Sequence, residues 1–220
     1  KAENLYSQAV EKTVPVTSCR AAEATKLLEN IFRSVNIALV NELKKVYQAM
    51  DIDVWEVIAA AKTKPFGYMP FYPGPGLGGH CIPIDPQYLA WKMKELEFNT
   101  RFIHLASEIN YGMPKYVFNK ILYALNDMGK PIKDSKVFII GVAYKADVAD
   151  LRESPALDLI NLLQDNQAHV EYHDPYISKI NIESINLDST SINKQVLEEA
   201  DCTVIMANHQ CLDWESIVQN

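Results

Sequence analysis

The chain of 220 residues lacks an excess of positive charge. It has 21 lysines and arginines against 28 aspartates and glutamates, a net charge of −7. This balance argues against nucleic-acid binding, which needs a concentrated basic face. No uninterrupted apolar run comes near the roughly 18 residues of a membrane span, so we predict no membrane contact. Only 8 glycines and 11 prolines occur, and 48% of the residues are hydrophobic, which is typical of a globular protein.

Cysteine is scarce too, with four copies. There is no C-x-x-C pair and no Cys/His cluster at zinc spacing, so we predict no metal site. Without a secretory signal, a chain of this size is not expected to carry a disulfide framework, and we expect a soluble, cytoplasmic protein. Cys81 is judged separately, and the other three thiols are interpreted as small buried hydrophobes: Cys19, Cys202 and Cys211.

Helical patterns dominate the first part of the chain. Apolar residues recur with the 3.6-residue period over 20–50, with no Gly or Pro between them. The stretch 65–86 holds too many prolines and glycines for a helix and is predicted to be a long loop, the kind that is usually functional. Shorter helices are predicted at 53–61, 87–96 and 102–128.

The residues before this region resemble the end of another domain. Helical periodicity covers 1–12, and 13–18 alternates like a short edge strand that contains Pro15. Neither element has a sequence partner, and the chain does not open on Met. We therefore interpret 1–18 as the tail of a missing upstream domain, followed by an all-helical domain over 19–131.

Strand and helix patterns alternate from residue 132 to residue 220. The run 136–141 is apolar, β-branched and ends in Gly, which is typical of a buried parallel strand. Ser154 followed by Pro155 is a typical helix start. Later elements are predicted as a strand at 169–174, a helix at 194–200 and a strand at 203–207. The alternation predicts an α/β fold with a Rossmann-like, doubly wound parallel sheet, to which one further strand would be expected.

Cys81 lies in the loop Pro73-Gly-Pro-Gly-Leu-Gly-Gly-His-Cys-Ile-Pro-Ile-Asp-Pro86. A thiol near cations or amides can be a nucleophile, and Asp85 could serve as general base for water. His80 directly precedes Cys81 and is poorly placed to act as its base. The glycines do not form a dinucleotide fingerprint, because no strand precedes them. An ordinary surface loop is the alternative interpretation.

Two more groups of polar residues stand out. Lysine and arginine at 145 and 152 follow the first strand of the second domain, at the sheet edge where such folds bind ligands. The alternative there is a generic loop with solvated charges. A polar stripe also follows one side of the long helix, where the alternative is a solvated face; it consists of Glu23, Lys26, Asn30 and Arg33.

Together these segments resemble the UDP-glucose/GDP-mannose dehydrogenase family, over 22–43, 73–86 and 141–156. The loop looks most like the branch that acts on UDP-N-acetylhexosamines, particularly UDP-N-acetylglucosamine 6-dehydrogenases. Ile84 stands where the UDP-glucose branch tends to have a Lys that contacts the cofactor. The resemblance implies three parts, namely an NAD-binding Rossmann domain that is absent here, a central helical dimerisation region, and a C-terminal Rossmann-like domain that binds UDP.

The family chemistry is a four-electron oxidation of a C6 alcohol to a carboxylate with two NAD+. The resemblance implies that Cys81 forms a thiohemiacetal and then a thioester, that Lys26 and Asn30 stabilise the oxyanion, and that Asp85 helps to activate water. Arg152 matches a residue that reaches NAD. Positions that match substrate contacts are Phe71, Tyr72, Pro73, Gly74, Gly78 and Lys145.

The sequence thus predicts a fragment of a UDP-N-acetylhexosamine 6-dehydrogenase that serves polysaccharide precursor synthesis and is inactive alone, because its cofactor domain is missing. The apolar stripe of the long helix predicts a homodimer. Two alternatives stay open at this point. One is a UDP-glucose or GDP-mannose dehydrogenase of the same family, and the other is a non-catalytic nucleotide-sugar binding or dimerisation module.

Overall fold

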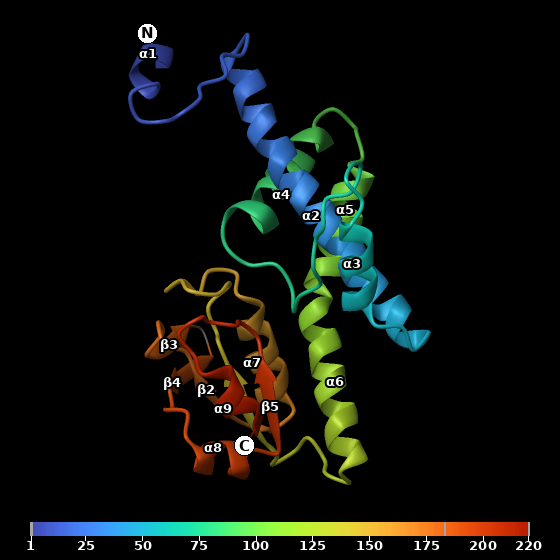
Figure 1. Ribbon diagram of the computed structural model, residues 1–220, viewed down its shortest axis with the longest axis vertical. Coiled ribbons are helices and arrows are strands. Elements are labelled where there is room, and N and C mark those ends of the chain that lie inside the picture. The colour runs from blue at the N-terminus through green and yellow to red at the C-terminus, as the bar shows by residue number, and fades with distance from the viewer. Residues whose placement is uncertain (1, 183, 220) are drawn as a thin grey trace.

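The computed structural model describes residues 2–182 and 184–219. Figure 1 shows a helical part, in blue and green, and a part built around a sheet, in orange and red. The chain is therefore a mixed α/β protein, as the sequence predicts. The short helix α1 (Ala2–Tyr6) stands apart from both parts.

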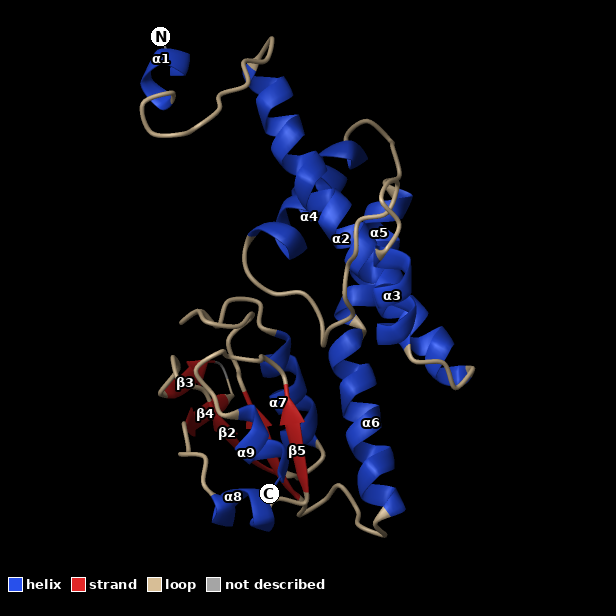
Figure 2. Ribbon diagram, viewed as in Figure 1, coloured by secondary structure: helices blue, strands red, loops and turns tan. Residues whose placement is uncertain are grey.

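The helical part is organised around α2 (Cys19–Ala49). Ser18 caps its start by accepting a hydrogen bond from the Ala21 N–H at 3.2 Å, as helix N-caps commonly do. Three helices pack on α2, and Figure 2 shows them gathered around its length. They are α3 (Val54–Lys62), α4 (Cys81–Lys94) and α5 (Arg101–Tyr111).

Helix α4 begins at Cys81, six residues before the predicted start at 87. The prediction was wrong because it took Pro83 and Pro86 as helix breakers. Pro83 lies in the first turn, where a backbone N–H has no intrahelical partner in any case. Pro86 does remove one interior hydrogen bond, and the helix continues through it. Cys81 is therefore the first residue of a helix and not a loop residue.

The single helix predicted over 102–128 is two helices. The chain breaks at Gly112, with Pro114 in the first turn of α6 (Met113–Asp127). Helix α6 runs alongside the second part of the chain and packs on α7 (Pro155–Asp165) (Figure 1). Its buried side chains join the core of that part, and they include Phe118, Ile121 and Leu125. The domain limits predicted at 18 and 131 stay a prediction.

Three parallel strands form the main sheet, in the order β2-β1-β5. They are β1 (Lys136–Ile140), β2 (His169–His173) and β5 (Cys202–Ile205). Strand β1 is central and is buried after its first residue, as its apolar run predicts. Because the chain moves to one side of β1 for β2 and to the other side for β5, the order reverses between β1 and β5. Ligands of open α/β sheets bind at such a point, outside the carboxyl ends of the strands.

An antiparallel pair, β3 (Lys179–Ile182) and β4 (Ile185–Asp188), follows β2 and was not predicted. Two short helices complete the chain, α8 (Lys194–Glu199) and α9 (Trp214–Gln219). The predicted cap of α7 is confirmed, because the Ser154 hydroxyl accepts from the Ala156 N–H at 3.3 Å. No helix among the described residues is long and apolar enough to cross a membrane.

Two expectations near the chain ends and the thiols need correction. Residues 13–18 form no strand, because no described strand lies beside them to pair with their backbone. Cys19 and Cys211 are exposed and not buried, and Cys202 is half-buried. Cys19 begins α2 and Cys211 follows β5 in a loop, so neither lies inside a hydrophobic core.

Candidate active site

The predicted catalytic residues lie on two helices that pack against each other. Lys26 and Asn30 are four residues apart on α2, and Cys81 and Asp85 are four residues apart on α4, so each pair shares one helix face. The Asn30 Nδ2 donates a hydrogen bond to the Asp85 Oδ2 at 2.6 Å. That bond joins the two pairs and crosses 55 positions of sequence.

Asn30 is completely buried and its orientation is fixed. An ionised carboxylate only accepts, so the amide nitrogen must face Asp85. The Asn30 Oδ1 is then left buried, with no hydrogen-bond partner among the residues that the structure describes. Buried polar atoms are nearly always satisfied. This oxygen can only accept, and it therefore suits a hydroxyl group or a water molecule at the site.

The Cys81 side chain is exposed at the first position of α4. No described side chain caps this helix. The free N–H groups and the positive end of the helix dipole therefore favour negative charge that develops beside the sulfur. Lys26 is also exposed, and its Nζ lies 3.9 Å from the Glu29 Oε2. The lysine thus shares the helix face with Asn30, and its recorded ion pair among the described residues is with Glu29 and not with Asp85.

The glycines before Cys81 allow the two parts of the chain to meet closely. A Cβ on Gly78 would lie 2.6 Å from both the Glu153 carbonyl oxygen and the Tyr144 Cβ. Gly79 has a φ of +80°, and a Cβ there would meet the Tyr144 ring at 2.8 Å. Figure 2 shows this loop descending to the second part before it enters α4. Gly78, expected to contact substrate, is therefore half-buried and packed against Tyr144 and Glu153.

A buried chain of three amides holds the earlier part of this loop. The Gly74 N–H donates to the Asn41 Oδ1 at 2.9 Å, and the Asn41 Nδ2 donates to the Asn110 Oδ1 at 2.9 Å. The Asn110 Nδ2 donates to the Ser34 carbonyl at 3.1 Å. Sequence reasoning missed this network. Its signal was Asn41, a polar residue three turns after Asn30 on the same side of an apolar helix.

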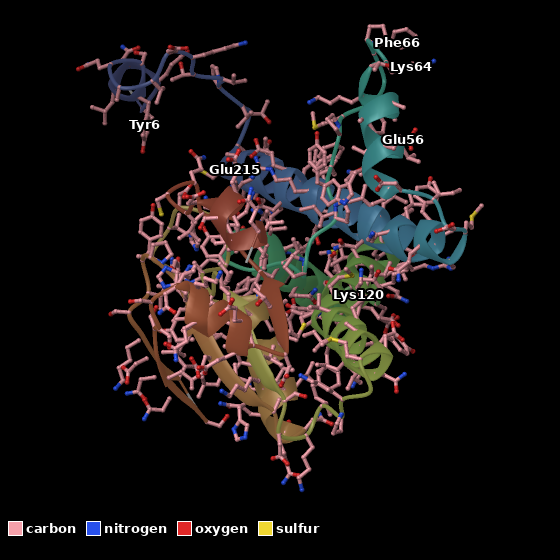
Figure 3. All side chains as sticks on the ribbon, turned by 60° about the horizontal axis from the view of Figure 1, so that its bottom comes forward. Tyr6, Glu56, Lys64, Phe66, Lys120 and Glu215 are labelled. Carbon is pink, nitrogen blue, oxygen red and sulfur yellow. The ribbon has the colours of Figure 1, made fainter. Side chains whose placement is uncertain are left out.

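Aromatic contacts place the start of the loop. The Phe71 ring meets Phe32 edge to face, with centroids 5.6 Å apart, and the Tyr72 ring stacks on Trp55 with centroids 6.0 Å apart. Figure 3 shows Phe66, at the far end of the loop, projecting away from the body of the molecule, and it is 75% exposed. The loop therefore leaves α3 outward and returns to the site at Phe71.

The loop between β1 and α7 carries the predicted substrate and cofactor residues. Lys145 is exposed, with its Nζ 5.6 Å from the centre of the Tyr144 ring. The Arg152 guanidinium donates to both carboxylate oxygens of Asp150. It also donates to the His80 Nδ1, at 3.1 Å. The hydrogen bonds from Arg152 lower the pKa of the Asp150 carboxyl to about 2, and the same bonds raise the pKa of Arg152.

A buried histidine–aspartate pair anchors that loop, and sequence reasoning did not predict it. The His209 Nε2 lies 3.0 Å from the Asp174 Oδ2, and neither residue is accessible to solvent beyond 3%. The His209 Nδ1 accepts from the Asp147 N–H at 3.0 Å, so the ring proton is on Nε2. Asp174 also accepts from the Val142 and Ala143 N–H groups. These hydrogen bonds connect the carboxyl ends of strands β1, β2 and β5 at the point where the strand order reverses.

The described residues do not build a dinucleotide site. Gly141 alone marks the turn after β1, and a Cβ there would meet the Ala207 carbonyl oxygen at 2.3 Å. Tyr144 and Glu153 occupy the space beside Gly78 and Gly79, which leaves no cradle for a pyrophosphate. Arg152, the predicted cofactor residue, is engaged by Asp150 and His80.

Comparison with known proteins identifies both parts of the chain. The model of the UDP-glucose/GDP-mannose dehydrogenase family, central domain, matches residues 20–112. The model of the UDP binding domain of the same family matches residues 138–219. These ranges follow the helical part and the sheet part of the structure.

Individual relatives support the same family assignment. The UDP-N-acetyl-D-mannosamine dehydrogenase of Methanococcus maripaludis is 38% identical over 94% of this chain and 46% of its own length. The NDP-N-acetyl-D-galactosaminuronic acid dehydrogenase of Ralstonia solanacearum is 34% identical over 95% of this chain and 48% of its own length. The UDP-D-ManNAc dehydrogenase structure from Pyrococcus horikoshii matches 99% of this chain and 50% of its own, with a TM-score of 0.85 and 32% identity. The chain spans about half the length of these relatives.

Proposed function

Because the chain belongs to the UDP-glucose/GDP-mannose dehydrogenase family, we propose that it forms the thiol-bearing and nucleotide-binding part of a UDP-N-acetylhexosamine 6-dehydrogenase. The observation that carries this proposal is the bond between Asn30 and Asp85, which joins the Lys26 face of α2 to the Cys81 face of α4. The four residues together offer a nucleophile, a carboxylate and two oxyanion donors.

The chemistry assigned to these residues begins at a C6 aldehyde. The Cys81 Sγ attacks the carbonyl carbon, which forms a C–S bond and leaves negative charge on oxygen. The free N–H groups at the start of α4, Asn30 and Lys26 stabilise that charge. Loss of hydride from C6, for which NAD is the acceptor in this family, turns the thiohemiacetal into a thioester. No described residue is assigned to that transfer.

Hydrolysis then releases the acid. Asp85 accepts a proton from a water molecule, whose oxygen attacks the thioester carbon, and the C–S bond breaks to return the Cys81 thiolate. The unpartnered Asn30 Oδ1 can hold this water by accepting its second hydrogen. A cysteine serves where serine would not, because the sulfur must be both nucleophile and leaving group.

The names of the relatives are relevant to the identity of the sugar in the proposed substrate. Proteins named for UDP-N-acetylmannosamine and for NDP-N-acetylgalactosaminuronic acid are among them. They favour an N-acetylated hexosamine over glucose or mannose. They do not support the preference for N-acetylglucosamine in particular, so we propose UDP-N-acetylmannosamine as the first substrate to test. We further propose that Lys145 contacts the nucleotide sugar and that NAD binds mainly to residues outside this chain.

The test uses the intact enzyme, in which this chain is joined to the proposed NAD-binding domain. We expect NADH and uronate from UDP-N-acetylmannosamine, and at least about a 10³-fold loss of turnover in Cys81→Ser. Cys19→Ser is the matched control, since Cys19 is also exposed at the first position of a helix. Residues 1–220 alone should produce no NADH. Unchanged turnover in Cys81→Ser would remove the thiol from the mechanism.

We also propose a homodimer through an apolar face formed by α4, α5 and the connection between them. The face consists of Tyr88, Trp91, Phe98, Phe102 and Leu105, each more than half exposed. A second copy would remove this area from water. Sedimentation of the chain should give a dimer, and Trp91→Asp with Phe102→Asp should give a monomer. Tyr123→Asp, at a 70% exposed residue of α6, should leave the dimer intact. A monomeric wild-type chain would contradict the proposal.

A further inference from the structure

Arg152 connects the two parts of the chain beside the proposed nucleophile. Its Nη1 donates to the His80 Nδ1 at 3.1 Å, and its Nε and Nη2 donate to Asp150 at 2.9 and 2.6 Å. The Arg152 carbonyl accepts from the Gly79 N–H at 2.9 Å. The mechanism above uses none of these bonds, although His80 directly precedes Cys81. They form a clamp, defined here as Asp150, Arg152 and His80.

The clamp fixes the protonation state of the His80 ring. A guanidinium group can only donate hydrogen bonds, so the His80 Nδ1 must carry the lone pair and the ring proton must lie on Nε2. A second proton, on Nδ1, would point at Arg152. It would break the hydrogen bond and set two cations against each other. The contact therefore exists only with a neutral ring.

Of the three side-chain types in the clamp, imidazole is the one that ordinarily changes charge near neutral pH. The charged groups recorded beside its ring are Arg152, which hydrogen-bonds it, and Asp150, which interacts with it electrostatically. The pKa of Asp150 is held at about 2 by Arg152. The carboxylate therefore stays ionised over the range in which imidazoles titrate, and Arg152 stays anchored to it.

The clamp lies where it can influence the position and reactivity of the Cys81 thiol. Helix α4 has no side-chain cap, and His80 is the residue at its N-cap position. Arg152 makes two hydrogen bonds at this helix end, since its guanidinium donates to the His80 ring and its carbonyl accepts from the Gly79 N–H. Arg152 also brings its positive charge near the Cys81 thiol. Release of His80 would loosen the helix start and weaken that electrostatic contact.

We propose that His80 is a positioning residue for Cys81: its neutral ring, held by the Arg152–Asp150 pair of the neighbouring loop, fixes the start of α4, and protonation of the ring releases it. The role rests on the proposed function only in taking Cys81 as the nucleophile. It assigns to His80 no proton transfer to or from the thiol.

The test measures iodoacetamide alkylation of the chain itself, by peptide mass mapping, from about pH 5.5 to about pH 8.5. The measured quantity is the alkylation rate of Cys81 divided by that of Cys19. Cys19 is the reference because both thiols are exposed at the first position of a helix and Cys19 lies outside the clamp. In the wild-type chain this ratio should fall by about three- to tenfold toward acid pH.

Two variants separate the clamp from general destabilisation. In His80→Asn the amide oxygen replaces Nδ1 as an acceptor that cannot be protonated, so the ratio should stay at its high-pH value throughout. In His80→Ala it should be low throughout, with the Cys19 rate unchanged as the check on folding. A pH-independent wild-type ratio, or the same acid step in His80→Asn, would overturn the proposal.

A second readout needs no variant. The nitrogen NMR shifts of His80 should show the Nε2–H tautomer at alkaline pH, and an Nδ1–H tautomer would overturn the clamp. Neither experiment uses a nucleotide sugar or NAD. The proposal about the clamp and the proposal of dehydrogenase activity can therefore be refuted independently.

Discussion

The contact between the glycine loop and the second part of the chain gives the most direct structural prediction. A Cβ on Gly78 would stand 2.6 Å from a backbone oxygen of Glu153 and from the Tyr144 Cβ. Neither atom is the free end of a flexible side chain. Gly78→Ala must therefore push the two parts away from each other, at a cost of about 1–3 kcal/mol for an overpacked site.

That cost corresponds to roughly a 5- to 150-fold fall in the folding equilibrium constant. Gly74→Ala is the matched control, because no heavy atom lies within 4 Å of a Cβ at Gly74. It should change stability by less than about 0.5 kcal/mol or raise it slightly. Urea denaturation of the chain measures both variants. Equal stability of the two variants would refute the close approach of Gly78 to Tyr144 and Glu153.

Three further predictions follow from single contacts. Asn41→Leu leaves the Gly74 N–H without its partner and should lower the free energy of unfolding by about 1–3 kcal/mol, again by urea denaturation. In Arg152→Ala the pKa of Asp150 should rise from about 2 toward its ordinary value in an NMR titration. In the wild type the stability from this carboxylate is present above about pH 4 and is lost as pH falls toward 2. Burial raises the pKa of Tyr172 to about 12, so the chain should lose stability from about pH 10 to 12. Tyr172→Phe should not show this alkaline loss in thermal melts.

Local signals predicted the elements they belong to. The start of α7 at Ser154 and Pro155 and the buried strand β1 were both predicted, because caps and apolar runs act within a few residues. The start of α4 was missed, because prolines usually end helices and the first-turn exception depends on where the helix begins. That start matters most for the site, since it places Cys81 and Asp85 on one helix face.

Long-range contacts could not be predicted from one sequence. The buried amides of Asn41 and Asn110 are 69 positions apart, and the bond from His209 to Asp174 crosses 35. Each residue taken alone is compatible with an exposed polar position. The β3–β4 pair was missed for a related reason, because its polar outward residues hide the strand pattern.

Formation of the sulfur–carbon bond tests the central claim most directly. The intact enzyme would be mixed with the C6 aldehyde of UDP-N-acetylmannosamine, labelled with carbon-13 at C6, in the absence of NAD. We predict a thiohemiacetal carbon signal in the wild type and in Cys19→Ser, and none in Cys81→Ser. The same signal in Cys81→Ser, or no signal in the wild type, would contradict the assignment of Cys81 as the nucleophile.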